Sequence, residues 1–198
     1  MKQGPTPHVC ARCPKVMSTS CCEVKPHERL ATITWADADR VQAATGLRVD
    51  DFTEWEWLDA DQAHAWLELH PAYRGYLDVA PRRLSLKAVD GRCTLLGEQG
   101  CTLEPEVRPT PCRIYPFDVE TGMLQVERFA SVEEARRLVV NGAAHACLAV
   151  EESRSLRELY RAFSTTASRV RELAVQLRAE VAAHVKRERA ARRSPARS

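Results

Sequence analysis

Apolar and polar residues alternate with the period of a helix in two segments of the first half of the chain. In the segment 35–45, three apolar residues share one helical face. Thr34 and Asp37 have the spacing of an N-terminal capping box, and Gly46 is placed to end the helix in a left-handed conformation. The segment 59–70 has the same periodicity and stops before a proline. Both segments are therefore predicted to be helices.

The longest periodic pattern lies in the last quarter of the chain. Apolar residues there alternate spacings of four and three, which is the heptad pattern of a helix-packing seam. They are Leu156, Tyr160, Phe163, Ala167, Val170, Ala174, Leu177 and Val181. We expect one long amphipathic helix from about 156 to 186. Its seam over 156–181 either docks on the rest of the chain or pairs with a partner protein or a second copy. Upstream, Ser131 and Glu134 open another predicted helix that stops near 141–142.

Strand periodicity appears in the middle of the chain. Residues 83–89 place alternate apolar residues on one face, and the Asp-Gly pair at 90–91 is a strong signal for a two-residue hairpin turn. The returning strand starts at Cys93, and a second turn over 97–100 precedes Cys101. The middle of the chain is therefore predicted to hold small antiparallel hairpins.

The remaining segments read as loops with one short strand. Prolines between 105 and 116 exclude regular structure there, and a strand is expected over 123–129. Residues 8–28 contain few periodic apolar residues and read as a loop organised by metal. The predicted fold is α+β: a small metal-stabilised domain over 1–150 with several helices, a short antiparallel hairpin or sheet and long loops. A long C-terminal helix over 151–186 and a basic flexible tail over 187–198 complete the predicted organisation.

Composition narrows the class of protein. The chain has 198 residues and is 44% hydrophobic, enough for one sizeable domain. It has no apolar run long enough to span a membrane and no apolar region near its start typical of a secretory signal, so we expect a cytoplasmic protein. The net charge of +2 is too small to argue for nucleic-acid binding, although positive residues are concentrated after 184.

Cysteines are the feature that points to chemistry. A first group is spaced C-x2-C-x7-C-C, a second lies in a stretch rich in Gly, Pro and Arg, and one cysteine stands alone downstream. The full set is Cys10, Cys13, Cys21, Cys22, Cys93, Cys101, Cys112 and Cys147. In a reducing cytoplasm, thiols ligate metal or carry redox chemistry, whereas disulfides are rare. Thiolates are preferred ligands of zinc and of iron–sulfur clusters, so we expect all eight to be metal ligands.

The spacing leaves the metal open. It is not the spacing of bacterial or plant-type ferredoxins. The histidine pair His64 and His70 lies too far from Cys10 and Cys13 to complete a Cys2His2 zinc finger. Eight thiols fit two four-thiolate sites, or one cluster with the surplus cysteines structural. We favour an iron–sulfur cluster, of the four-iron type, over zinc because clustered extra thiols and arginines suit a redox or catalytic centre.

A second motif surrounds the later cysteines. Residues 91–117 read GRCTLLGEQGCTLEPEVRPTPCRIYPF, with the pattern R-P-x-x-C-R-x-Y-P-F at their end. Together with the first cysteine group, this motif makes about residues 8–150 resemble the YkgJ-type cysteine-cluster family. The seven-residue gap between Cys13 and Cys21 is longer than the family commonly has. The resemblance implies a zinc- or iron-chelating domain related to flagellin lysine N-methylases.

Residues inside the motif are expected to surround the metal. A four-thiolate centre carries about two net negative charges, and burying that charge requires compensation. Arg108 and Arg113 are the predicted sources of positive charge, and Tyr115 with the Pro-Phe pair after it is expected to pack in the core. Two alternatives stay open. One is an S-adenosylmethionine-dependent lysine methyltransferase, although no glycine-rich nucleotide loop is present; the other is a zinc-stabilised interaction module.

Overall fold

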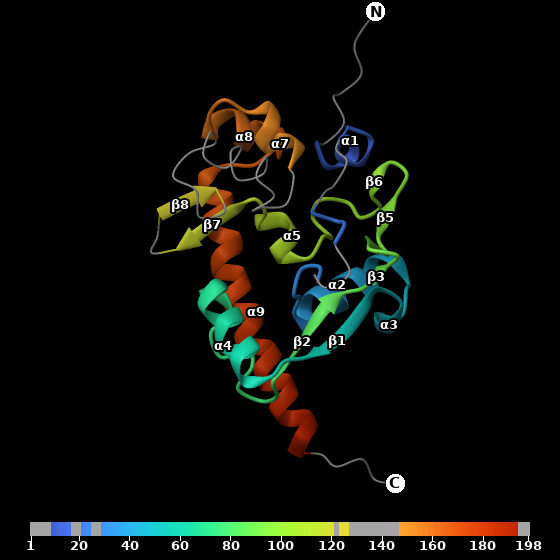
Figure 1. The fold of residues 1–198 in the computed structure, drawn as a ribbon, viewed down its shortest axis with the longest axis vertical. Helices are drawn as coiled ribbons and strands as arrows, with labels where there is room; N and C mark the ends of the chain where they lie inside the picture. Colours follow the sequence, from blue (N-terminus) through green and yellow to red (C-terminus); the bar gives the residue numbers. More distant parts are fainter. Residues whose placement is uncertain (1–8, 17–20, 25–28, 121–122, 127–146, 194–198) are drawn as a thin grey trace, which may run out of the picture.

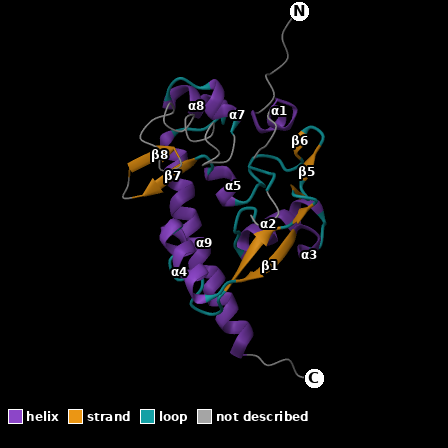
Figure 2. Ribbon diagram, viewed as in Figure 1, coloured by secondary structure: helices purple, strands orange, loops and turns teal. Residues whose placement is uncertain are grey.

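A long C-terminal helix runs along the molecule, and the shorter elements lie on both sides of it and at one end (Figure 1). The structure is a computed structural model that describes residues 9–16, 21–24, 29–120, 123–126 and 147–193. Helices make up most of these residues, and the strands form short, separate antiparallel pairs beside them (Figure 2). The predicted α+β class is confirmed.

The elements follow one another in a mixed order along the chain. The helices are α1 (Val9–Val16), α2 (Trp35–Thr45), α3 (Val49–Phe52), α4 (Ala60–Leu69), the 3-10 helix η1 (Pro71–Tyr73), α5 (Thr110–Ile114), α7 (Leu148–Glu152), α8 (Leu156–Ala162) and α9 (Ala167–Arg193). The strands are β1 (Thr53–Trp57), β2 (Arg82–Leu86), β3 (Ala88–Val89), β4 (Arg92–Cys93), β5 (Leu96–Gly97), β6 (Gly100–Cys101), β7 (Phe117–Glu120) and β8 (Met123–Val126).

Helix α2 forms as its sequence predicts. The Thr34 hydroxyl accepts a hydrogen bond from the amide of Asp37, and the Asp37 carboxylate accepts one from the amide of Thr34 at 3.0 Å. Gly46 ends the helix in a left-handed conformation with a φ of 73°. Glycine adopts this conformation at little free-energy cost because it has no Cβ. On the predicted apolar face, Ala38 and Val41 are completely buried and Trp35 is half-buried. The second predicted helix is also present, as α4.

The middle of the chain forms three antiparallel strand pairs, of which two are hairpins. The predicted turn joins β3 to β4, with positive φ angles of 51° at Asp90 and 76° at Gly91, as a type I′ turn requires. The second predicted turn joins β5 to β6. The strand predicted over 83–89 is divided, because its first part, β2, pairs instead with β1. Strand β1 was not predicted from the sequence.

Two segments that were predicted to be irregular contain helices. Residues 9–16 form α1 where a loop was expected, and 110–114 form α5 inside the proline-rich stretch. Pro111 lies in the first turn of α5, where a missing amide hydrogen breaks no helical hydrogen bond. The predicted strand over 123–129 is confirmed for 123–126; its end and the helix predicted after Ser131 lie outside the described residues.

The predicted C-terminal helix is broken into two. Helix α8 ends before Phe163, and α9 starts at Ala167. The break directs the side chain of Phe163 toward a hydrophobic core cluster, where its ring centroid lies 5.8 Å from that of Phe117. Ser164 takes a φ of 50° in this connection, a left-handed conformation that is uncommon for residues with a side chain. A single continuous helix from 156 was therefore a wrong prediction.

Helix α9 docks on its own chain. It packs on α2, α5, η1 and β7, and Val170, Ala174, Leu177 and Val181 of the predicted seam are buried. The helix also continues to Arg193, so most of the predicted flexible tail is helical. No helix in the described ranges combines the length and apolar character needed to cross a bilayer.

Candidate functional site

Helix α1 carries the first two cysteines. Cys10 and Cys13 are three residues apart, so they share one face of the helix. The helix packs on β6 and α7. Gly100 of β6 makes this approach possible, since a Cβ at this position would lie only 2.5 Å from the carbonyl oxygen of Cys10. The close packing at Gly100 therefore fixes where α1, with its two thiols, is held.

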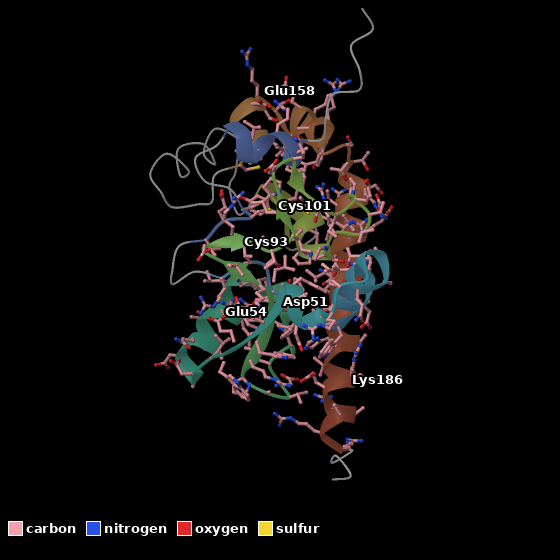
Figure 3. The ribbon with its side chains drawn as sticks, turned by 90° about the vertical axis from the view of Figure 1, so that its right-hand side faces the viewer. Asp51, Glu54, Cys93, Cys101, Glu158 and Lys186 are labelled. Atoms are coloured by element: carbon pink, nitrogen blue, oxygen red, sulfur yellow. The ribbon has the colours of Figure 1, made fainter. Side chains whose placement is uncertain are left out.

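The adjacent pair Cys21 and Cys22 lies beside strand β4. The carbonyl oxygen of Cys22 accepts a 2.9 Å hydrogen bond from the amide of Cys93, and the amide of Val24 donates a 2.8 Å bond to Gly91. The segment 21–24 thus extends the edge of the β3–β4 hairpin. Figure 3 places Cys93 and Cys101 in the middle of the molecule, between the labelled Glu158 at one end and Lys186 toward the other.

The last two cysteines come from short helices. Cys112 lies in α5, whose first residue Thr110 donates its amide hydrogen to Asp37 of α2 at 2.7 Å. The Thr110 hydroxyl donates a 2.8 Å bond to Glu180 of α9. Cys147 precedes the first residue of α7. Cys112 is therefore positioned by contacts of its helix with α2 and α9.

Most of the cysteines converge on one cavity. A cavity of about 40 Å³ is lined by Cys10, Cys13, Cys21, Cys22, Cys112 and Cys147. Leu96, Tyr115 and Phe163 complete its apolar wall. Cys93 and Cys101 do not line it, but they pack in the hydrophobic cluster that also contacts Cys22 and Cys112. All eight cysteines lie in described segments, and none is in a disulfide.

The thiols do not form a finished coordination sphere. Within the described residues, no group of three or more His, Cys, Asp or Glu side chains is arranged to hold a metal ion. The cavity has room for a few water-sized atoms. The donor set fits a thiolate-bound metal by its chemistry, because six sulfurs meet at one apolar cavity.

Burial keeps most of these thiols protonated. It raises the pKa of Cys10 to about 11 and that of Cys93 and Cys147 to about 12 each. Cys22 is the exception, because a hydrogen bond from the Cys21 thiol lowers the pKa of Cys22. The same bond raises the pKa of Cys21 well above its ordinary value. Cys22 is therefore the thiol that ionises most readily.

Cys22 lies within electrostatic range of most of the other cysteines. Its negative charge raises the pKa of five other cysteines besides its neighbour, which places it close to both groups. These are Cys10, Cys13, Cys93, Cys101 and Cys112. The cysteines of the two sequence groups therefore form one connected cluster.

Of the two arginines predicted beside the metal, Arg108 is the one whose charge acts on the thiols. It is 9% exposed, and its Nε donates a 3.1 Å hydrogen bond to the carbonyl of Leu103. Its positive charge lowers the pKa of Cys10 and Cys22, against the effect of burial at Cys10. Arg113 instead pairs with the carboxylate of Glu106.

Three further residues belong to the site, and the sequence predicted only part of what each one does. Tyr115 was expected to pack in the core and does so, as part of the cavity wall. Phe163 belonged to the predicted helix seam, and its place at the cavity follows from the helix break. Asp37 was recognised as a helix cap, but nothing in the sequence indicated that it also holds α5 through Thr110.

Comparison with known proteins identifies no relative. No protein-family model, curated protein or solved structure matches this chain. The resemblance to the YkgJ-type family therefore depends on the cysteine and arginine motifs alone. Any functional conclusion has to come from the cysteine cavity itself.

Proposed function

We propose that this protein binds a metal centre through the thiolates of its cysteine cluster. The observation that carries the proposal is the convergence of cysteines from four separate segments on one apolar cavity. Those segments are α1, the 21–22 pair, α5 and the start of α7. Soft, anionic thiolates are suited to zinc and to iron–sulfur clusters. Six thiols grouped around one apolar cavity are better explained by such a centre than by packing alone.

The residues at the cavity would be the ligands. The candidates are Cys10, Cys13, Cys21, Cys22, Cys112 and Cys147. Six candidates exceed the four of one tetrahedral site, so the surplus either bridges two metals or stays protonated. Cys93 and Cys101 pack in the same hydrophobic cluster as Cys22 and are proposed as structural or bridging partners. Because most of these thiols have raised pKa values, metal binding would release protons.

Arg108 supports the proposal because it supplies positive charge near the thiols. A buried thiolate centre is anionic, and the burial of net charge is costly unless it is compensated. The Arg108 side chain is itself buried and acts electrostatically on Cys10, Cys22 and Cys101. When bound, an iron–sulfur cluster would supply electron transfer and zinc would supply structural cross-linking. A reducing compartment such as the cytoplasm would suit either centre.

Metal content tests the proposal directly. The protein is purified without air, and its iron, zinc and sulfide are measured together with its absorption spectrum. A broad band near about 400 nm with about four irons per chain supports an iron–sulfur cluster. A colourless protein with one or two zinc ions supports a structural thiolate site. Protein that contains no metal, and whose unfolding is unchanged by added zinc or by cluster reconstitution, overturns the proposal.

Two cysteine variants locate the centre. Cys13→Ser and Cys112→Ser are expected to lose metal and stability together, because each removes a sulfur at the cavity. Leu177→Ala is the matched control, since it leaves a cavity in the core of α9 that costs about 3 kcal/mol without touching a thiol. Full metal content in both cysteine variants, or equal metal loss in the control, contradicts the assignment.

A further inference from the structure

A second, larger cavity adjoins the cysteine cavity. Its volume is about 370 Å³, within the range of sites for small molecules. Cys10, Cys112 and Phe163 line both cavities, so the two share a wall. The second cavity differs from the first in being lined by charged side chains, which include three arginines.

The arginines are Arg108, Arg113 and Arg169, and an acidic side chain already lies against two of them. The carboxylate of Glu106 pairs with Arg113 and lies 3.4 Å from Arg169. The side chain of Arg113 is 10% exposed, whereas that of Glu106 is 78% exposed. An exposed carboxylate thus reaches back to a largely buried guanidinium.

We propose that this cavity binds a small organic carboxylate, which takes the place of Glu106 between Arg113 and Arg169. A guanidinium presents a planar fork of donors that matches a carboxylate, so the geometry that receives Glu106 also receives a ligand with the same group. Glu106 lies on a loop beside Pro105 and is mostly in solvent, so it can swing away without disturbing the core.

The charge balance of the cavity favours an anion once Glu106 leaves. Three arginines and Glu104 then remain in the lining, and Glu172 beside it still pairs with Arg169 at 3.1 Å, which leaves an excess of positive charge. The apolar part of the wall, with Phe163 and Leu173, suits the carbon skeleton of an organic acid better than a free inorganic anion. The ligand is therefore assigned as a carboxylic acid with a short apolar portion.

The shared wall gives the ligand a place relative to the thiols. Its far end would lie toward Cys10 and Cys112, next to the centre proposed above. This relation to a metal centre rests on the proposed function. The carboxylate site itself does not, because Arg113 and Arg169 are present whether or not metal is bound.

Calorimetric titration with succinate and citrate tests the site. The Glu106→Gln variant is expected to bind these acids at least tenfold more tightly than the wild type, since the competing carboxylate is gone. Adding Arg113→Gln or Arg169→Gln to that variant is expected to reverse the gain. The Arg169 side chain is half-exposed, so its substitution is expected to disturb folding less than that of Arg113. Succinamide, which is uncharged, should not bind.

Arg189→Gln is the matched control. Arg189 is an ion-paired arginine on the same helix as Arg169, about 30 Å farther along it. Absence of binding in both wild type and Glu106→Gln overturns the proposal, as does an Arg189→Gln effect equal to that of Arg169→Gln. Metal is measured in the same samples. Acid binding by metal-free protein supports the site while the proposed function fails; metal without acid binding overturns the site alone.

Discussion

The amide nitrogen of Thr110 donates a 2.7 Å hydrogen bond to Oδ1 of Asp37. Asp37 is completely buried and also accepts hydrogen bonds from the amide and hydroxyl of Thr34. One carboxylate therefore caps α2 and holds the first turn of α5, two residues before Cys112. The position of a candidate ligand is thus fixed by a side chain far from it in the sequence.

Asp37→Ala is expected to lower both stability and metal content. It leaves the buried amide of Thr110 without its acceptor and removes the Asp37 half of the capping box of α2, which together cost about 3 kcal/mol of unfolding free energy. Asp39→Ala is the control, because Asp39 lies exposed on the same helix and pairs with Arg187 at the surface. Chemical denaturation and metal analysis give the readout. Equal loss in the two variants would contradict the role of Asp37.

Gly100→Ala is expected to displace α1. The new Cβ would lie 2.5 Å from the carbonyl oxygen of Cys10 and 2.6 Å from the Cα of Ala11, so helix and strand have to separate. Gly75→Ala is the matched control, because Gly75 has a similar positive φ but only the Asp78 side chain nearby, at 3.5 Å. In both variants the positive φ is expected to lower the unfolding free energy by about 1 kcal/mol, because alanine disfavours it. A further loss of metal content and stability is predicted for Gly100→Ala alone.

His184 is expected to make stability fall in mild acid. Its Nδ1 accepts a hydrogen bond from the amide of Trp35 at 3.2 Å, and its ring stacks on Tyr76. Burial lowers the pKa of His184 to about 4, against the opposing charge of Glu188. The unfolded chain therefore takes up a proton first as pH falls, so this contribution is complete above about pH 6.5 and is lost toward pH 4.

The size of that loss is about 2–3 kcal/mol. Unfolding free energies at pH 7 and pH 5 are compared for the wild type and His184→Gln, because other groups titrate equally in both. The positively charged neighbours Arg82 and Arg187 further disfavour protonation. A pH dependence that is the same in both proteins would rule out His184 as its source.

Glu188→Ala is expected to loosen the end of α9 that had been predicted to be a flexible tail. Its carboxylate accepts hydrogen bonds from Nε1 of Trp35 at 2.9 Å and from Arg82 at 2.7 Å. Loss of both partly buried contacts should lower the unfolding free energy by about 2 kcal/mol. Lys186→Ala, at an exposed position of the same helix, should change it by less than about 0.5 kcal/mol. Similar changes in unfolding free energy for the two variants would contradict the role of Glu188 in holding residues 187–193 against the rest of the chain.

Features with a local cause were predictable from the sequence. The capping box at Thr34, the turn at 90–91 and the apolar face of α9 each depend on residues within a few positions of one another. Strand β1 has the alternation of a strand in Thr-Glu-Trp-Glu-Trp, but its partner β2 lies 25 or more residues away. Pairing at that distance has no local signature.

The candidate site was likewise predictable only where its features are local in the sequence. The donors are plain in the sequence, because cysteine spacing is local, but their common cavity is a tertiary feature. Arg108 and Arg113 stand five residues apart in one motif, yet one acts on the thiols and the other on Glu106. The break after α8 could not be predicted from the heptad pattern, because Phe163 fits that pattern and the core contact equally well.

The hydrogen bond between Thr110 and Glu180 also has a consequence for the order in which the protein is made. Cys147 is the last cysteine of the chain, and Glu180 follows it in α9. During synthesis, all eight thiols leave the ribosome before the helix that secures α5. The nascent chain therefore holds its complete set of thiols before α9 is present to secure α5, the helix that carries Cys112.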